Sequence, residues 1–157
     1  MRKSIIDHSA RRVSPFEQNW LEIEELAKIE VTSEDPNFPI ESALSSKMGQ
    51  GWRAAEKGSQ IIRIIFDEPR SLQRIRLEFC ETEVERTQEF ILRWSAEPAG
   101  LFKEIVRQQW NFSPQGSTSE VEDYQVKLSG ISLLELALRP DLTPDNALAT
   151  LASWRMA

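Results

Sequence analysis

Trp52 and Arg53 are the neighbouring residues whose chemistry best suits ligand binding in this sequence. They follow Gly49 and Gly51 in the segment GQGWR, where glycine frees the backbone beside a bulky side chain. An indole face can stack on a sugar ring, and a guanidinium can donate paired hydrogen bonds to hydroxyl or carboxylate oxygens. The alternative is that Trp52 fills the base of a hydrophobic core while Arg53 pairs with a local carboxylate.

Phe38 is a further aromatic candidate because it stands between Pro36 and Pro39, which exclude this segment from regular structure. An exposed ring at a loop tip can contact a ligand. The same ring could equally pack onto the core and hold the loop in place. We predict Phe38, Trp52 and Arg53 as ligand-binding residues, with these packing roles as the alternative.

Signatures of catalysis and of cofactor binding are lacking. His8 is the only histidine and Cys80 the only cysteine, so the sequence holds no Cys-His dyad, no zinc cluster and no Ser-His-Asp triad beyond the N-terminal segment. The phosphate-binding patterns GxGxxG and GxxxxGK[ST] are absent. A carboxylate pair for glycoside hydrolysis stays open, because 25 acidic residues always offer pairs. We predict a noncatalytic protein without a metal or cofactor.

Composition predicts one globular domain: the chain has 157 residues, of which 40% are hydrophobic and 28% charged. The net charge of -6 argues against a nucleic-acid partner. No segment reaches the roughly 18 consecutive apolar residues of a membrane span, and the N-terminus lacks the apolar stretch of a secretory signal. We therefore expect a cytoplasmic location. The lone Cys80 excludes an intrachain disulfide and is expected to pack as a small apolar side chain.

Alternating apolar and polar residues predict β-strands as the elements that position these side chains. Two strands, 61–66 and 74–79, are expected to be joined by the turn Asp-Glu-Pro-Arg, with Ile62, Ile64 and Phe66 on one face of the first and Ile75, Leu77 and Phe79 on one face of the second. Further strands are expected at 27–33, 90–95, 102–112, 124–128, 134–138 and 148–156, with a Ser-Gly turn at 129–130. Their register places Trp94, Trp110 and Trp154 in the core.

The remaining segments connect these strands. Residues 20–27 could form a helical turn or begin a strand, and 40–48 are expected to form a short helix or turn. The polar stretches 81–89 and 113–123 are expected to be loops. About eight strands at roughly 10- to 15-residue spacing predict an all-β jelly-roll sandwich over 19–157. Residues 1–18 are expected to form a flexible or loosely docked arm.

Several arginines fall at outward-facing strand positions: Arg63, Arg74, Arg76, Arg93 and Arg107. If their strands are neighbours, the guanidinium groups would form a basic stripe suited to carboxylate or phosphate partners. Glu78, Glu104 and Glu135 lie on the same or nearby strands, so we expect cross-strand ion pairs on a solvated face instead.

The colinear order of several motifs carries a family resemblance. The motifs are IEVTSED, PIESAL, GWRAAEKGSQIIRIIFDEP, LQRIRLEF, FILRWSAEPAGLFKEIVRQ, YQVKLSGISLLELALRPD and ALATLASWRM. From about Leu26 to Arg155 the chain resembles the discoidin, or coagulation factor 5/8 type C, domain of the galactose-binding-like superfamily. The resemblance implies a jelly-roll sandwich that binds sugars, anionic lipid surfaces, proteins or broken DNA in loops at one end. That end would comprise residues 34–40, 48–57 and 81–89, and the fold alone does not choose the ligand.

Two departures from the family pattern bear on metal binding and on the cellular compartment of the protein. Ser45 and Ser46 stand where many members carry an Asp-Gly pair that helps hold Ca²⁺, an ion that needs several oxygen ligands. A single cysteine cannot form the disulfide that ties the ends of extracellular members. Both departures fit a reduced intracellular version of the domain.

These observations together predict a noncatalytic binding module whose ligand is a carbohydrate or similar polar group. The alternative is a cytoplasmic protein-interaction or assembly module, with a homodimer formed through a sheet face. The missing export signal and the missing calcium turn favour this alternative.

Overall fold

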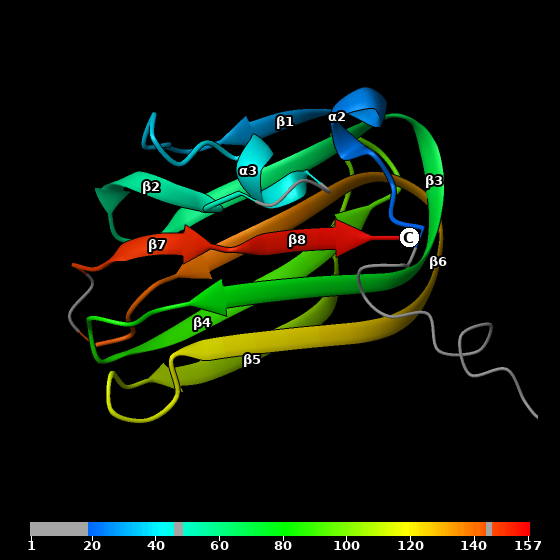
Figure 1. The fold of residues 1–157 in the computed structure, drawn as a ribbon. Helices are drawn as coiled ribbons and strands as arrows, with labels where there is room; N and C mark the ends of the chain where they lie inside the picture. The colour runs from blue at the N-terminus through cyan, green and yellow to red at the C-terminus, as the bar shows by residue number, and fades with distance from the viewer. Residues whose placement is uncertain (1–18, 46–48, 144–145) are drawn as a thin grey trace, which may run out of the picture.

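The computed structural model describes residues 19–45, 49–143 and 146–157 (Figure 1), so the predicted N-terminal arm lies outside the described residues. The described chain forms α2 (Ile23–Leu26), β1 (Ala27–Val31), α3 (Glu41–Leu44), β2 (Trp52–Lys57), β3 (Gln60–Cys80), β4 (Arg86–Ser95), β5 (Lys103–Phe112), β6 (Ser119–Arg139), β7 (Leu148–Leu151) and β8 (Ser153–Met156). Neither of these single-turn helices is long or apolar enough to span a bilayer.

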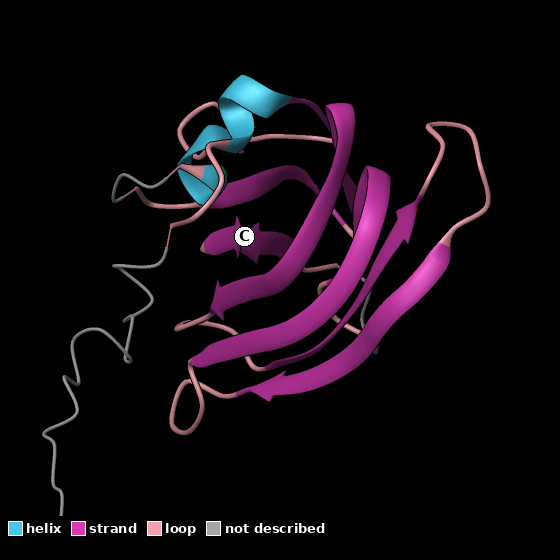
Figure 2. Ribbon diagram, turned by 90° about the vertical axis from the view of Figure 1, so that its right-hand side faces the viewer, coloured by secondary structure: helices cyan, strands magenta, loops and turns pink. Residues whose placement is uncertain are grey.

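Two long strands build both layers of the fold. β3 and β6 each have 21 residues and pair antiparallel from one end to the other. They curve together, so each strand runs through one layer and then through the other (Figures 1 and 2). The first half of β3 pairs with β1, and its second half pairs with β8. This shared, bent pair of strands makes the chain a jelly-roll β-sandwich, as predicted from the sequence.

The bend replaces both turns that the sequence suggested within these strands. The β3–β6 register is interrupted between Ile65 and Arg70, where Pro69 has no N–H to donate to the ladder. On β6 the bend holds Gly130, whose φ of 70° belongs to a region that glycine adopts without strain. The predicted Asp-Glu-Pro-Arg and Ser-Gly turns are therefore wrong, because these residues bend continuous strands instead of ending them.

The remaining strands extend the two layers. The larger sheet has the order β1-β3-β6-β4-β5, β8 adds to β3, and β2 forms a separate ladder with β7. The predicted single closing strand is divided at Ala152, whose N–H donates to the carbonyl of Glu78 at 2.8 Å. The predicted loops at 81–89 and 113–123 are shorter than expected, because β4 begins at Arg86 and β6 at Ser119. The strand β2 was not predicted from the sequence.

The core lies between the layers and follows the predicted alternation. Both apolar triplets of β3 are buried: Ile62, Ile64 and Phe66 in its first half, and Ile75, Leu77 and Phe79 in its second. Trp154 is buried as predicted, whereas Trp94 and Trp110 are only partly buried and pack against the edge of the core. Burying such side chains stabilises the sandwich by roughly 25 cal/mol per Å² of apolar surface.

Ion pairs satisfy the outward-facing arginines, so these residues do not form a free basic stripe. Arg63 and Arg93 approach Glu135 from the two neighbouring strands, with Nε–Oε distances of 2.8 and 2.7 Å. The other pairs are Arg74 with Asp123, Arg76 with Glu78, and Arg107 with Glu89 and Glu104. These contacts match the expected ion pairs, most of them across strands.

Candidate ligand-binding cleft

At one end of the sandwich, β2 and β7 lie beside the β3–β4 connection (Figure 1). Residues of these segments line a cleft of about 650 Å³. Its lining residues come from Phe38, from Gln50 and β2, from residues 80–84, and from residues 146–152. Three of these four segments coincide with the loops that the family resemblance places at one end. The fourth, residues 146–152, was not predicted, because only its pairing with β2 brings it there.

Phe38 and Arg53 meet at this cleft. The backbone N–H of Arg53 donates to the Phe38 carbonyl at 3.1 Å, and the backbone N–H of Asp35 donates to the Arg53 carbonyl at 2.9 Å. Glu34 holds the other end of the loop by accepting the Ile40 N–H at 2.6 Å. The guanidinium carbon of Arg53 lies 4.2 Å from the centre of the Phe38 ring, a cation–π arrangement. The two half-exposed side chains therefore form a single stacked unit at the surface.

Trp52 lies beneath the cleft and not in its opening. Its side chain is 1% exposed, and its indole Nε1 donates to the carbonyl of Ser33 at 3.1 Å. A ligand does not reach the indole face in this position, so the packing role is the one that the geometry allows. The preceding Gly51 has a φ of 79°, and a Cβ there would meet the Leu151 carbonyl oxygen at 2.5 Å. Glycine at this position lets Trp52 enter the core while β2 stays close to β7.

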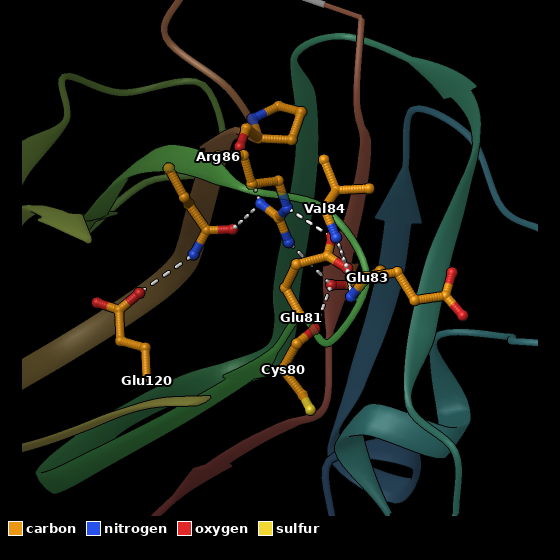
Figure 3. Close-up of polar contacts among 9 residues, drawn as sticks. Cys80, Glu81, Glu83, Val84, Arg86 and Glu120 are labelled. Atoms are coloured by element: carbon orange, nitrogen blue, oxygen red, sulfur yellow. Dashed lines mark hydrogen bonds and ion pairs between the residues drawn. The ribbon is translucent and has the colours of Figure 1, made fainter. Parts of the chain in front are cut away.

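A buried arginine, Arg86, holds the cleft wall formed by residues 80–84 in place. Figure 3 shows its polar contacts. Arg86 is buried, and its Nε donates to Glu81 Oε1 at 2.8 Å. The other oxygen, Oε2, accepts the backbone N–H groups of Glu83 and Val84 at 3.2 and 3.4 Å. Burial by itself raises the pKa of Glu81, but the hydrogen bonds from Arg86 and these N–H groups outweigh it, so the pKa is lowered. The wall is thereby held by a carboxylate that stays charged.

The Arg86 guanidinium is satisfied on its other sides as well. Its Nη1 donates to Gln88 Oε1 at 3.1 Å and to the Pro140 carbonyl at 2.8 Å, and its centre lies 4.8 Å from the Phe112 ring. The sequence predicted a loop at Arg86, so the buried position of this arginine was not predicted. The signal was present, since Arg86 and Gln88 share the alternation of the buried Phe90 that follows them.

The network continues to Glu120, an acid that is buried. Gln88 Nε2 donates to Glu120 Oε1 at 3.2 Å, while Glu120 Oε2 has no hydrogen-bond partner among the described residues. Burial, reinforced by the neighbouring Glu122, raises the pKa of Glu120 to about 8. Glu120 is therefore largely protonated at neutral pH, which reduces the cost of burying it.

The open part of the cleft combines apolar and polar groups. Val84 is 49% exposed and Leu148 37% exposed, and they add apolar surface to that of the Phe38 ring. Lys57, Glu83, Thr82 and Asn146 add exposed hydrogen-bonding groups. Such a mixture suits a ligand that presents both C–H faces and hydroxyl groups.

Cys80 also lines this cleft, and its side chain is exposed. The expectation that it packs as a small apolar residue is therefore wrong. The position follows from the strand alternation, because Cys80 faces opposite to the buried Phe79.

Two other observations bear on alternative sites. A hollow of about 710 Å³ is lined by Gln73, Arg74, Asp123 and their neighbours, but no aromatic side chain is among its described lining residues. Across residues 19–45, 49–143 and 146–157, no group of three or more His, Cys, Asp or Glu side chains is placed to hold a metal ion. The end cleft is therefore the stronger candidate for a binding site.

Comparison with known proteins identifies relatives in structure but not in sequence. No protein-family model matches this chain, and no curated protein matches it. The fold is similar to the family 32 carbohydrate-binding module of Clostridium perfringens NanJ, solved with galactose, with a TM-score of 0.59, 12% identity, and coverage of 87% of this chain and 96% of that one. It is also similar to the family 32 module of AlyQ, solved with 4,5-unsaturated mannuronic acid, with a TM-score of 0.58, 13% identity, and coverage of 84% and 95%.

A third similar structure is a Ruminococcus gnavus GH29 fucosidase in complex with fucose, with a TM-score of 0.63 and 8% identity. The match covers 84% of this chain, which spans only 25% of the fucosidase chain. At these identities the comparisons establish the fold, which is that of the family 32 carbohydrate-binding modules. The fold is shared by proteins of several functions, so the function is argued from the cleft.

Proposed function

We propose that this chain is a noncatalytic carbohydrate-binding module and that its end cleft holds the sugar. The stacked pair of Phe38 and Arg53 at the surface of the cleft is the observation that carries this proposal. In the proposed complex, Phe38 and Arg53 contact the ligand, whereas Trp52 supports β2 from below.

The composition of the cleft supports a sugar over a purely apolar ligand. The ring of Phe38 and the side chains of Val84 and Leu148 supply apolar contact for the C–H groups of a pyranose. Arg53 and Asn146 supply hydrogen-bonding groups for hydroxyls. Solved structures of similar fold hold galactose or a mannuronic acid derivative, which supports the class of ligand and leaves the particular sugar open.

Isothermal titration calorimetry against a panel of oligosaccharides tests the proposal. We expect at least one member of the panel to bind, and Phe38→Ala and Arg53→Ala each to weaken that binding by about tenfold or more. Arg107→Ala is the matched control, because this arginine is ion-paired on a strand away from the cleft. Absence of sugar binding by the folded wild type, or equal binding by all three variants, contradicts the proposal.

A further inference from the structure

We propose that the sugar bound by this cleft carries a carboxylate, which is received by Arg53, while Lys57, four residues further along β2, adds positive charge to the same cleft. This inference rests on the proposed function and specifies the class of its ligand: an acidic glycan such as a uronic acid. It follows from which charges at the cleft are already compensated within the chain and which are not.

Arg53 differs from the arginines of the outer faces. The arginines at positions 63, 74, 76, 93 and 107 each have a carboxylate partner. Arg53 has no ion pair or side-chain hydrogen bond with any residue that the structure describes, and its guanidinium lies over the Phe38 ring. Lys57 also lacks an ion pair within the described part of the chain. The β2 side of the cleft therefore presents two cations that the described residues leave uncompensated.

The carboxylates of the cleft do not cancel this charge. Of the lining residues described, Glu81 and Glu83 are acidic, and Arg53 and Lys57 are basic. Glu81 is committed to Arg86, which lies behind the wall and neutralises it. Glu83 extends away from this pair in Figure 3 and is the acid that remains. Two cations against one free carboxylate give the described lining of the cleft a net positive charge, on a chain whose net charge is -6.

The geometry of Arg53 suits a carboxylate in particular. A guanidinium held over an aromatic ring is partly ordered before the ligand arrives, which reduces the conformational freedom lost on binding. Its N–H groups lie at the edges of that plane, where they can donate to both oxygens of a carboxylate. A hydroxyl offers one acceptor atom to the same fork. The stacked Arg53 therefore favours an acidic sugar over its neutral counterpart.

Matched sugar pairs that differ only at C6 test this inference. The probes are oligosaccharides of galacturonic, glucuronic and mannuronic acid, each compared with the galactose, glucose or mannose oligomer of the same linkage, by calorimetry with the full chain. In any pair that binds, we expect the acidic member to bind about tenfold more tightly at about 50 mM NaCl. This preference should fall at about 500 mM NaCl, because a charge interaction at an open cleft is screened by salt.

The variants Arg53→Gln and Arg53→Lys distinguish the effect of the positive charge on binding from the effect of the planar guanidinium geometry. We expect Arg53→Gln to remove the preference for the acid, Arg53→Lys to keep part of it, and Lys57→Gln to reduce it less than Arg53→Gln does. Equal or tighter binding of the neutral members by the wild type overturns the inference and leaves the proposed function standing. If neither member of any pair binds, the proposed function fails and the inference fails with it.

Discussion

The buried guanidinium of Arg86 and the carboxylate of Glu81 lie 2.8 Å apart, and the pair joins the interior of the sandwich to the wall of its end cleft. Glu81 then holds the backbone N–H groups of residues 83 and 84. The wall is thus set in place before any ligand arrives. Such preorganisation lowers the entropy lost on binding and improves affinity without adding a contact.

Arg86→Ala should be strongly destabilising, because it leaves the Glu81 carboxylate, Gln88 and the Pro140 carbonyl without their donor. Breaking one side of a buried pair costs about 3 to 5 kcal/mol. Urea denaturation followed by tryptophan fluorescence measures this cost. Glu81→Gln is a milder variant for the case in which Arg86→Ala does not fold, and it should lower both stability and ligand affinity. A loss below about 1 kcal/mol for Arg86→Ala would show that the ion pair does not hold the fold.

Glu120 should make the protein less stable as the pH rises. Its pKa in the folded state, about 8, is above its usual value of 4.5, so the folded state holds this proton where the unfolded state has released it. The contribution of Glu120 is therefore fully present below pH 4.5 and is lost as the pH rises through about 8. Glu120→Gln should remove this dependence and become more stable relative to wild type as the pH rises from 5 to 9, by up to about 4 kcal/mol.

Unfolding curves of wild type and Glu120→Gln across this range measure the effect. Glu85→Gln, an exposed change in the nearby connection, is the control and should follow the wild type. Parallel pH profiles for wild type and Glu120→Gln would mean that Glu120 ionises in the folded protein as it does in water.

Gly51→Ala should destabilise the β2 side of the cleft. The residue has a positive φ, and the added Cβ would lie 2.5 Å from the Leu151 carbonyl oxygen, which is backbone of β7. We expect a loss of about 2 kcal/mol or more in the free energy of unfolding. Gly116→Ala is the matched control, since the nearest atom to its Cβ is 3.6 Å away and its loss should be about 0.5 kcal/mol or less. Equal losses for the two variants would contradict this account of Gly51.

The oligomeric state distinguishes the proposed function from the alternative of an assembly module. Because the outward arginines are paired within the chain, they do not require a partner, and we expect a monomer of 18.1 kDa. Multi-angle light scattering over a range of concentrations measures the mass. A stable dimer would support the assembly module.

The sequence predicted the elements whose side chains alternate over a buried face. Ile62, Ile64 and Phe66 on β3 could be assigned to the core because period-two patterns depend on local residues alone. The continuity of β3 through Pro69 could not, because the same residue types serve bends and turns, and long-range pairing decides between them.

The cleft was predictable to a similar extent. Phe38 and Arg53 could be nominated from residue type and local context, and the resemblance placed their loops at one end. The burial of Trp52 depends on how β2 packs against the core, and the contribution of residues 146–152 depends on pairing between residues more than ninety positions apart. Arg86 was missed because a charged residue next to an acidic stretch is usually solvated, and only its position in β4 shows that it points inward.

The location of the bound sugar tests the central claim most directly. In ¹H–¹⁵N correlation spectra of the labelled chain titrated with a binding oligosaccharide, we predict shifts concentrated at residues 38, 53, 57, 81–84 and 146–152. Residues on the far side, including Gln73 and Asp123, should remain unchanged. Shifts concentrated around Gln73 and Asp123, with none near Phe38 and Arg53, would contradict the assignment of the end cleft as the binding site.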